Sequence, residues 1–161
     1  MTTPSAVSTL SVANVFVFTD DHEKSLAFYR DTLGFTVATD VSNGGFRWCT
    51  LKTPTQPELE IVLQNTGIYP GMSEADQAAM ADLLAKGMLG ALIFGTDDVD
   101  GVFERVAASG AEVLQEPADQ FYGVRDCAFR DPAGNMIRFK KDLASGPDTT
   151  GWTDHAASAD N

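Results

Sequence analysis

The chain is poor in cysteine, histidine and basic residues. Its 161 residues include two cysteines, two histidines and 11 Lys plus Arg against 23 Asp plus Glu. Cys49 and Cys127 are far apart and lack CxxC spacing, so neither a disulfide framework nor a thiolate zinc site is indicated. His22 sits at a predicted helix start and His155 near the end of the chain, so no predicted strand supplies an imidazole to a metal.

The acidic balance and the lack of long apolar runs narrow the possible partners. A formal charge of −12 repels phosphate backbones and anionic lipid, so we expect neither a nucleic-acid partner nor a membrane partner. The longest apolar run, around residues 88–94, is too short to span a bilayer. Residues 1–11 lack the basic and apolar features of a secretory signal, and we therefore expect a cytoplasmic protein.

The most informative feature that is present is an internal repeat. The segment at residues 14–21 reads Asn-Val-Phe-Val-Phe-Thr-Asp-Asp, and the segment at residues 91–98 reads Ala-Leu-Ile-Phe-Gly-Thr-Asp-Asp. Each is followed by a helical pattern that ends at a glycine, Gly34 or Gly110. A repeat of this size cannot cover its own apolar face, so the two units should pack together and leave a shared cleft.

Both repeats predict the same order of elements, βαβββ. The predicted strands lie at residues 11–18, 35–41, 46–51 and 58–64 in the first unit and at 90–95, 112–115, 124–130 and 135–141 in the second, with helices at 22–32 and 99–109. Asp131-Pro-Ala-Gly-Asn135 predicts a tight hairpin turn.

These elements predict an α+β fold with one domain over residues 1–141. Its two modules span about 10–66 and 88–141. Between them, Ser73 opens a linker helix at about 73–86, which could serve as a lid or a dimer contact. Residues 142–161 have little to bury apart from Trp152, and we expect a flexible C-terminal tail there.

Several motifs resemble the vicinal oxygen chelate superfamily, which includes glyoxalase I, bleomycin resistance proteins and extradiol dioxygenases. The motifs are Ser25-Leu-Ala-Phe-Tyr-Arg-Asp-Thr-Leu-Gly-Phe35, Asp97-Asp-Val-Asp100, Tyr122-Gly-Val-Arg125 and Asp131-Pro-Ala-Gly-Asn-Met-Ile137. The resemblance implies a curved mixed β-sheet cleft and a homodimer. It does not fix the activity, since one fold hosts many chemistries.

The resemblance also implies four metal-ligand positions, one on the first and one on the last strand of each module. In this sequence they hold Asn14, Glu60, Ala91 and Arg138. Only Glu60 is a good ligand, because alanine offers no lone pair and arginine offers only donors and a positive charge. We therefore predict no metal site and no cofactor. Arg138 takes the place of the ion in this hypothesis and neutralises Glu60; the alternative is that Arg138 merely forms a surface ion pair.

Aromatic side chains should form the wall of the cleft. Strand alternation places Phe16 on the face of Asn14 and Trp48 on a neighbouring strand, while Tyr122 lies in the loop that leads into the predicted strand at 124–130. Rings with a few polar groups suit a small organic ligand, although ordinary core packing explains the same pattern. The predicted ligand-binding residues are Asn14, Phe16, Trp48, Glu60, Tyr122 and Arg138.

The leading functional prediction is a metal-independent small-molecule-binding protein that sequesters a drug or an aromatic metabolite. The alternative is an enzyme, either a glyoxalase-like lyase or isomerase or a ring-cleaving dioxygenase, with a rearranged divalent metal site. A third possibility is metal-free catalysis with Glu60 as general base. Glu60 is the catalytic candidate only if the protein is an enzyme.

Overall fold

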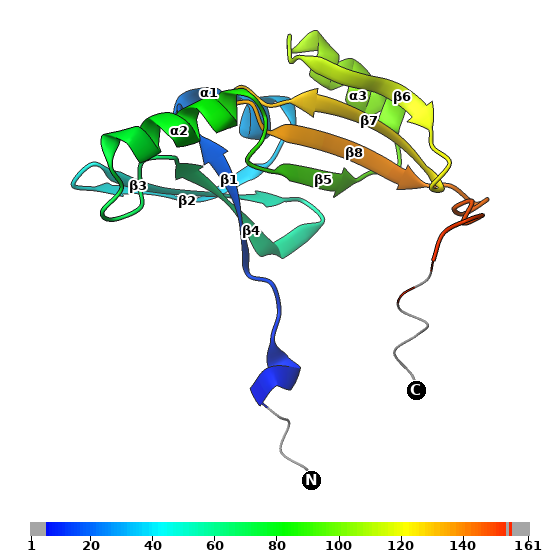
Figure 1. Cartoon of the computed structure of the whole chain (residues 1–161), viewed down its shortest axis with the longest axis horizontal. Helices are drawn as coiled ribbons and strands as arrows, with labels where there is room; N and C mark the ends of the chain where they lie inside the picture. The colour runs from blue at the N-terminus through cyan, green and yellow to red at the C-terminus, as the bar shows by residue number, and fades with distance from the viewer. Residues whose placement is uncertain (1–5, 154, 156–161) are drawn as a thin grey trace.

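The computed structural model describes residues 6–153 and residue 155, which form two β-rich modules joined by a helix (Figure 1). After the short 3-10 helix η1 (Ala6–Thr9), the first module contains β1 (Asn14–Thr19), α1 (His22–Leu26), the π-helical η2 (Ala27–Thr32), β2 (Thr36–Asn43), β3 (Phe46–Thr53) and β4 (Gln56–Asn65). The linker helix is α2 (Glu74–Ala85). The second module contains β5 (Ala91–Gly95), α3 (Val99–Ala108), β6 (Val113–Asp119), β7 (Val124–Arg130) and β8 (Met136–Asp142).

Each module forms its own four-stranded mixed sheet. The strand orders are β1-β4-β3-β2 and β5-β8-β7-β6. In both sheets the first strand runs parallel to the last, and the remaining pairs are antiparallel. The predicted α+β fold of two βαβββ modules is therefore confirmed.

The first helix differs from the regular helix that its sequence predicts. Asp21 caps it, since its Oδ1 accepts the amide hydrogens of Glu23 and Lys24. After five residues, however, the helix widens into the π-helical η2. The wider turn brings the consecutive rings of Phe28 and Tyr29 into the core together.

Strand bounds also differ where the sheet is irregular. β1 begins at Asn14, three residues later than predicted, where its register with β4 begins. β6 continues to Asp119 instead of ending at residue 115. Its pairing with β7 contains two register shifts, and such bulges break the alternation on which the sequence prediction rests.

The helix-facing sides of the two sheets merge into one core. Phe35 of the first module and Phe94 of the second meet with ring centroids 5.3 Å apart, and Phe94 stacks on Phe139 at 5.8 Å. Tyr29 and Phe129 are fully buried in the same cluster. Burying a large apolar side chain contributes about 1.5–3 kcal/mol to the free energy of unfolding. Because the rings of one module bury those of the other, each module gains part of its stability from its neighbour.

The turn at residues 131–135 joins the modules as well as two strands. Asp131 Oδ1 accepts the amide hydrogens of Ala133, Gly134 and Asn135, at 2.9–3.0 Å. Its Oδ2 accepts the Tyr29 hydroxyl at 2.7 Å, and the Asn135 amide nitrogen donates to the Phe18 carbonyl at 2.7 Å. Burial and then the Asp131 carboxylate raise the pKa of Tyr29 well above its usual value, so the phenol remains a donor.

Helix α2 lies on the helix-bearing side of the first sheet, beside α1 (Figure 1). The predicted cap is present, because Ser73 and Asp76 form a capping box. Leu84 is its one buried residue, and Gly134 packs so closely that a Cβ there would lie 2.2 Å from the Leu84 carbonyl oxygen. This position does not fit a lid over the opposite faces. Among the described residues, none of the helices has the length and apolar character that a bilayer span requires.

The described part of the predicted tail is tied to the loop before β7. The Leu143 amide donates to the Gly123 carbonyl at 2.9 Å, and the Asp148 amide donates to the Phe121 carbonyl at 2.8 Å. Trp152 then meets Phe121 edge to face, with centroids 6.0 Å apart. The segment therefore keeps contact with the second module up to residue 152.

Candidate functional site

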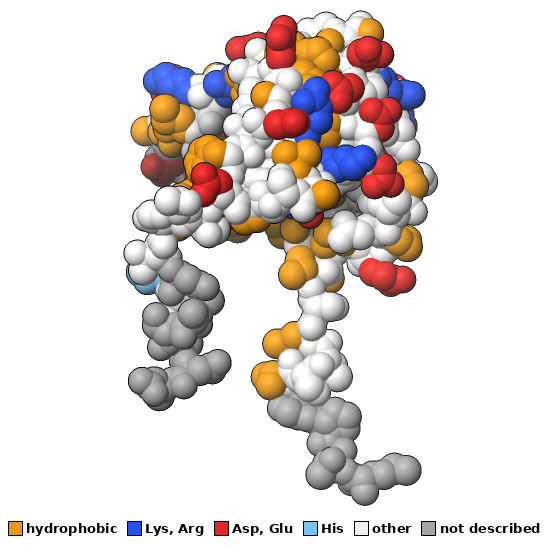
Figure 2. Space-filling view, turned by 90° about the vertical axis from the view of Figure 1, so that its right-hand side faces the viewer, with side chains coloured by type: hydrophobic (Ala, Val, Ile, Leu, Met, Phe, Trp, Pro, Cys, Tyr) orange, Lys and Arg blue, Asp and Glu red, His pale blue; other side chains and the backbone are white. Residues whose placement is uncertain are grey.

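The predicted site residues lie on the sheet faces that no core helix covers, which we call the outer faces. On the first sheet, the register places Asn14 beside Glu60 and Phe16 beside Val62, with Thr50 opposite Val62 on the next strand. On the second sheet, Arg138 lies beside Ile93. Figure 2 shows apolar side chains along the lower rim of the body, where both terminal segments leave it.

The outer face of the first sheet carries an aromatic platform, which we define as Phe16, Phe46 and Trp48. The Trp48 ring lies 6.5 Å from Phe16 and 6.4 Å from Phe46. Phe16 and Phe46 remain 53% and 42% exposed. The neighbouring Thr50 hydroxyl is buried, and no hydrogen-bond partner for it occurs among the described residues. The platform thus offers apolar surface that the described chain itself leaves open.

Glu60 has a different partner from the one that the sequence predicts. Its Oε1 lies 3.5 Å from Nζ of Lys52, a cross-strand neighbour on the same outer face. Arg138 instead bonds within its own module, so the predicted Glu60–Arg138 pair is wrong. The physical reason is that each side chain has an oppositely charged partner on its own sheet. Glu60 has Lys52, and Arg138 has Asp126.

The outer face of the second sheet carries a buried polar cluster around Asp126, which is itself only 1% exposed. We call it the Asp126 network. Its carboxylate accepts hydrogen bonds from Gln115 Nε2 at 2.6 Å, Gln120 Nε2 at 3.0 Å, the Tyr122 hydroxyl at 2.8 Å and Arg138 Nη1 at 2.6 Å. The structure thereby brings Tyr122 and Arg138 together, because both donate hydrogen bonds to the Asp126 carboxylate.

The hydrogen bonds of this network shift the pKa values of Asp126 and Tyr122 in opposite directions. Burial alone would raise the pKa of Asp126, but the bonds from Gln115, Tyr122, Arg138 and Gln120 outweigh it and lower the pKa below 3.8. Burial, followed by the bond to Asp126, raises the pKa of Tyr122. Both shifts favour an ionised Asp126 carboxylate that accepts these bonds and a neutral Tyr122 hydroxyl that donates one of them.

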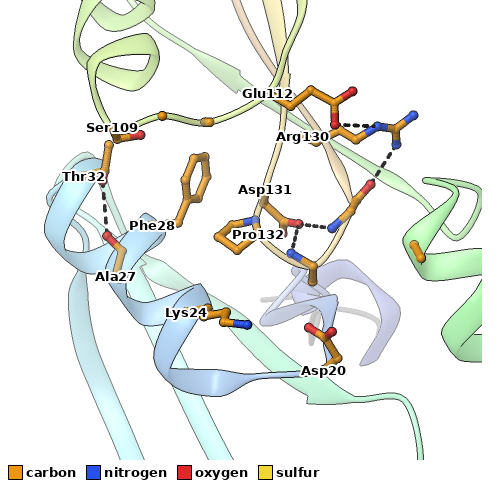
Figure 3. Close-up of a pocket in the computed structure, with 15 residues that line it drawn as sticks. Asp20, Lys24, Ala27, Phe28, Thr32, Ser109, Glu112, Arg130, Asp131 and Pro132 are labelled. Atoms are coloured by element: carbon orange, nitrogen blue, oxygen red, sulfur yellow. Dashed lines mark hydrogen bonds and ion pairs between the residues drawn. The ribbon is translucent and has the colours of Figure 1, made fainter.

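A hollow of about 570 Å³ lies on the opposite side, between the first helix and the turn of the second module (Figure 3). Arg130 sits at its edge, where it pairs with Glu112 at 3.6 Å and donates to the Gly134 carbonyl at 3.0 Å. Phe28 and Asp131 line the interior and already make core and turn contacts. None of the predicted site residues lines this hollow.

Comparison with known proteins agrees with this architecture. The family model of the Glyoxalase/Bleomycin resistance protein/Dioxygenase superfamily matches residues 11–139. The chain belongs to this superfamily. The crystal structure of UcmS2 is 32% identical, with a TM-score of 0.72 over 81% of this chain and 97% of that one.

Two further relatives have comparable identity. TnmS3, an antibiotic binding protein from Streptomyces sp. CB03234, is 28% identical, with a TM-score of 0.64 over 84% of this chain and 98% of that chain. The uncharacterized protein YurT of Bacillus subtilis is 29% identical over 122 residues, which is 76% of this chain and 91% of YurT.

The donor set at the superfamily's metal positions does not fit a divalent ion. Asn14 and Glu60 are direct neighbours, but the partner of Ala91 on the last strand is Met136, and Arg138 lies two pairs further along, beside Ile93. Arg138 is bonded to a carboxylate and has only donors to offer. Within the described residues, no three His, Cys, Asp or Glu side chains are grouped as metal ligands.

Sequence reasoning missed Asp126, the centre of the polar network. The signal was available in the alternation of β7, because Cys127 and Phe129 face the core and Asp126 must then face outward. Arg47 and Arg125 are half-buried and form ion pairs within their own modules: Arg47 with Asp40 and Glu23, and Arg125 with Asp100 and Asp119.

Proposed function

We propose that this chain is a metal-independent small-molecule-binding protein that sequesters a drug or an aromatic metabolite. The observation that carries the proposal is the aromatic platform, where large rings stay exposed on a sheet face beside a buried hydroxyl that lacks a partner in the described chain. A planar ligand would gain stacking and apolar burial there. Capture would be an equilibrium process, with no chemical step.

The Asp126 network supplies orientation in this proposal. Both described hydrogen bonds of Arg138 use Nη1, so Nε and Nη2 remain available to an acceptor on a ligand. Asp126 holds the guanidinium in place, and Tyr122, which is partly exposed, adds an aromatic edge. The six predicted ligand-binding residues keep that role as a proposal, divided between two sheets.

The antibiotic-binding relative supports the ligand class. TnmS3 is named for antibiotic binding and shares the fold over almost its whole length. The same fold with exposed aromatic rings on this chain favours an antibiotic-like or other aromatic compound. The acidic chain, with its formal charge of −12, favours a neutral or cationic one.

We further propose that a homodimer completes the site. Ile93 on the second outer face is 55% exposed, and with the aromatic platform it forms apolar surface on both sheets. Such surface favours an interface. A second copy could cover it and enclose the ligand. Light scattering at micromolar concentration should give twice the chain mass, whereas a monomer that still binds ligand would remove the dimer from the proposal.

Tryptophan fluorescence tests the binding proposal directly. The chain has two tryptophans, so Trp152→Phe leaves Trp48 as the single reporter. Planar aromatic antibiotics titrated into chelator-treated Trp152→Phe protein should include at least one that quenches Trp48 saturably. Phe16→Ala should weaken that ligand about five-fold, as expected for one lost ring contact. If no compound binds, or binding requires an added divalent metal, the proposal is wrong.

We also propose that the protein binds no metal cofactor. Protein purified without chelators should contain substoichiometric Ni, Zn, Mn and Fe by elemental analysis, because the donor set offers one good ligand. Stoichiometric metal that disappears in Glu60→Gln would instead favour the lyase, isomerase or dioxygenase alternative.

A further inference from the structure

A second pocket lies at the junction of the two modules. Its volume is about 330 Å³, near the lower end of small-ligand sites of roughly 300–1,000 Å³. It is bounded by the end of the first helical segment, the β3–β4 turn, β5, α3 and β8. None of the six proposed outer-face ligand residues lines it.

The inner surface of this junction pocket is apolar and comes from both modules. Phe35 and Phe94 meet edge to face at 5.3 Å, and Phe94 stacks on Phe139 at 5.8 Å. Val102 and Val106 of α3 complete the surface. These rings belong to the common core, so they are held rigidly and can receive an apolar body without reorganisation.

Arg105, at the rim, is electrostatically unlike the other arginines. All six arginines are described, and five have a carboxylate partner within 4.0 Å: Arg30, Arg47, Arg125, Arg130 and Arg138. Arg105 bonds only to carbonyl oxygens, through Nε to Thr32 and through Nη2 to Asp31 at 3.5 Å. Within the described chain its positive charge is therefore not neutralised by an ion pair.

The remaining polar groups of the pocket are neutral. No Asp or Glu lines it, although the chain as a whole carries a formal charge of −12. Thr53 contributes a buried hydroxyl with no partner among the described residues. β5 is an edge strand, and the Thr96 amide donates to the Lys140 carbonyl of β8. Because peptide groups alternate along a strand, those of Ile93 and Gly95 point toward the free edge of β5.

We propose that the junction pocket binds a small monocarboxylate with an aromatic or aliphatic body. The body lies against Phe35, Phe94 and Phe139, and the carboxylate forms a charge-assisted bond with Arg105. A single guanidinium matches one carboxylate, whereas a phosphate dianion would bring a second charge into an apolar site that cannot compensate it. The site shares Ile93 with the second outer face but contains none of the six proposed outer-face ligand residues.

Phenylacetate and its uncharged analogue phenylacetamide make a matched pair of probes. By NMR titration of the full chain, phenylacetate should bind saturably at concentrations up to about 10 mM and at least about ten-fold tighter than phenylacetamide, since one charge-assisted bond separates them. Shifts should appear at Phe94 and Gly95. Equal binding of the two probes, or no saturable binding of phenylacetate, would overturn the proposal.

Variants locate the binding site. Arg105→Gln should reduce phenylacetate affinity about ten-fold, while Arg30→Gln, which removes an arginine already paired with Asp31, should leave it unchanged. Val102→Phe should block the pocket with Arg105 intact, which keeps the test valid if Arg105→Gln unfolds. Asp126→Asn, on the outer face, should retain binding. Full affinity in both Arg105→Gln and Val102→Phe would place the carboxylate elsewhere and contradict the proposal.

Discussion

The two sheets share one strand order but present opposite chemistry on their outer faces. The first carries the aromatic platform and an exposed Lys52–Glu60 pair, whereas the second carries the buried Asp126 network. In both sheets the positions that face the core must hold apolar side chains that pack together. The outer-face positions have no such requirement, and they hold aromatic rings in the first sheet and a polar network in the second.

The charged side chains of the two outer faces also differ in burial. Asp126 is buried and accepts four side-chain hydrogen bonds, while Glu60 and Lys52 keep side-chain exposures of 28% and 36%. A buried acid depends on its partners far more than an exposed one. Mutations on the two faces should therefore have very different effects on stability.

The largest effect is expected from Asp126→Ala. It removes the common acceptor of four donors and leaves the Arg138 charge without its partner, so the free energy of unfolding should fall by about 3 kcal/mol. Urea denaturation measures this change. Asp40→Ala, which removes a partner of the more exposed Arg47 pair, is the control and should cost less than about 1 kcal/mol. Equal losses would erase the distinction between buried and exposed pairs.

The next largest effect is expected at the contact between the modules. Tyr29→Phe deletes the buried bond to Asp131 and should lower the free energy of unfolding by about 2 kcal/mol, as for a hydrogen bond to a charged group. Tyr69→Phe, at an exposed tyrosine, should be neutral in the same denaturation experiment. A neutral Tyr29→Phe would mean that apolar packing alone joins the modules.

Acidic pH should reduce the stabilisation that the Asp126 network provides. Because the pKa of Asp126 is lowered in the folded state, its contribution is complete above the ordinary value of 3.8 and is lost as the pH falls through the lowered folded-state value. The stability difference between wild type and Asp126→Asn should therefore shrink by about 1 kcal/mol between pH 6 and pH 2.5. A constant difference over this range would contradict the assigned ionisation.

The smallest effect is expected from Glu60→Gln. An ion pair with this exposure is worth less than about 0.5 kcal/mol, so thermal and urea unfolding should hardly change. Lys52→Gln should behave in the same way. A loss of several kcal/mol would show that Glu60 is held by a stronger partner than Lys52.

The fold was largely accessible from the sequence because its signals are local. The duplicated Asp-Asp helix starts, the glycine stops and the Asp131–Asn135 turn each encode their own geometry. The superfamily resemblance then supplied the packing of one module on the other. The π-helical η2 and the bulged β6 were missed because both depend on tertiary packing and register rather than on local preference.

The site was only partly accessible, because cross-strand partners depend on register. The neighbours Asn14 and Glu60 lie together as their repeat positions suggest, and Phe16 meets Trp48. The pairing of Arg138 could not be obtained from the repeat alone, since Asp126 on β7 lies within reach of its guanidinium. Charge counting without register assigned the arginine to the wrong acid.

A pair of double-mutant cycles tests the separation of the two faces most directly. Combining Asp126→Asn with Arg138→Gln should give a coupling energy of about 2 kcal/mol in the free energy of unfolding, while combining Glu60→Gln with Arg138→Gln should give a value near zero. The reverse result, with Arg138 coupled to Glu60 and not to Asp126, would contradict the account of two independent outer faces.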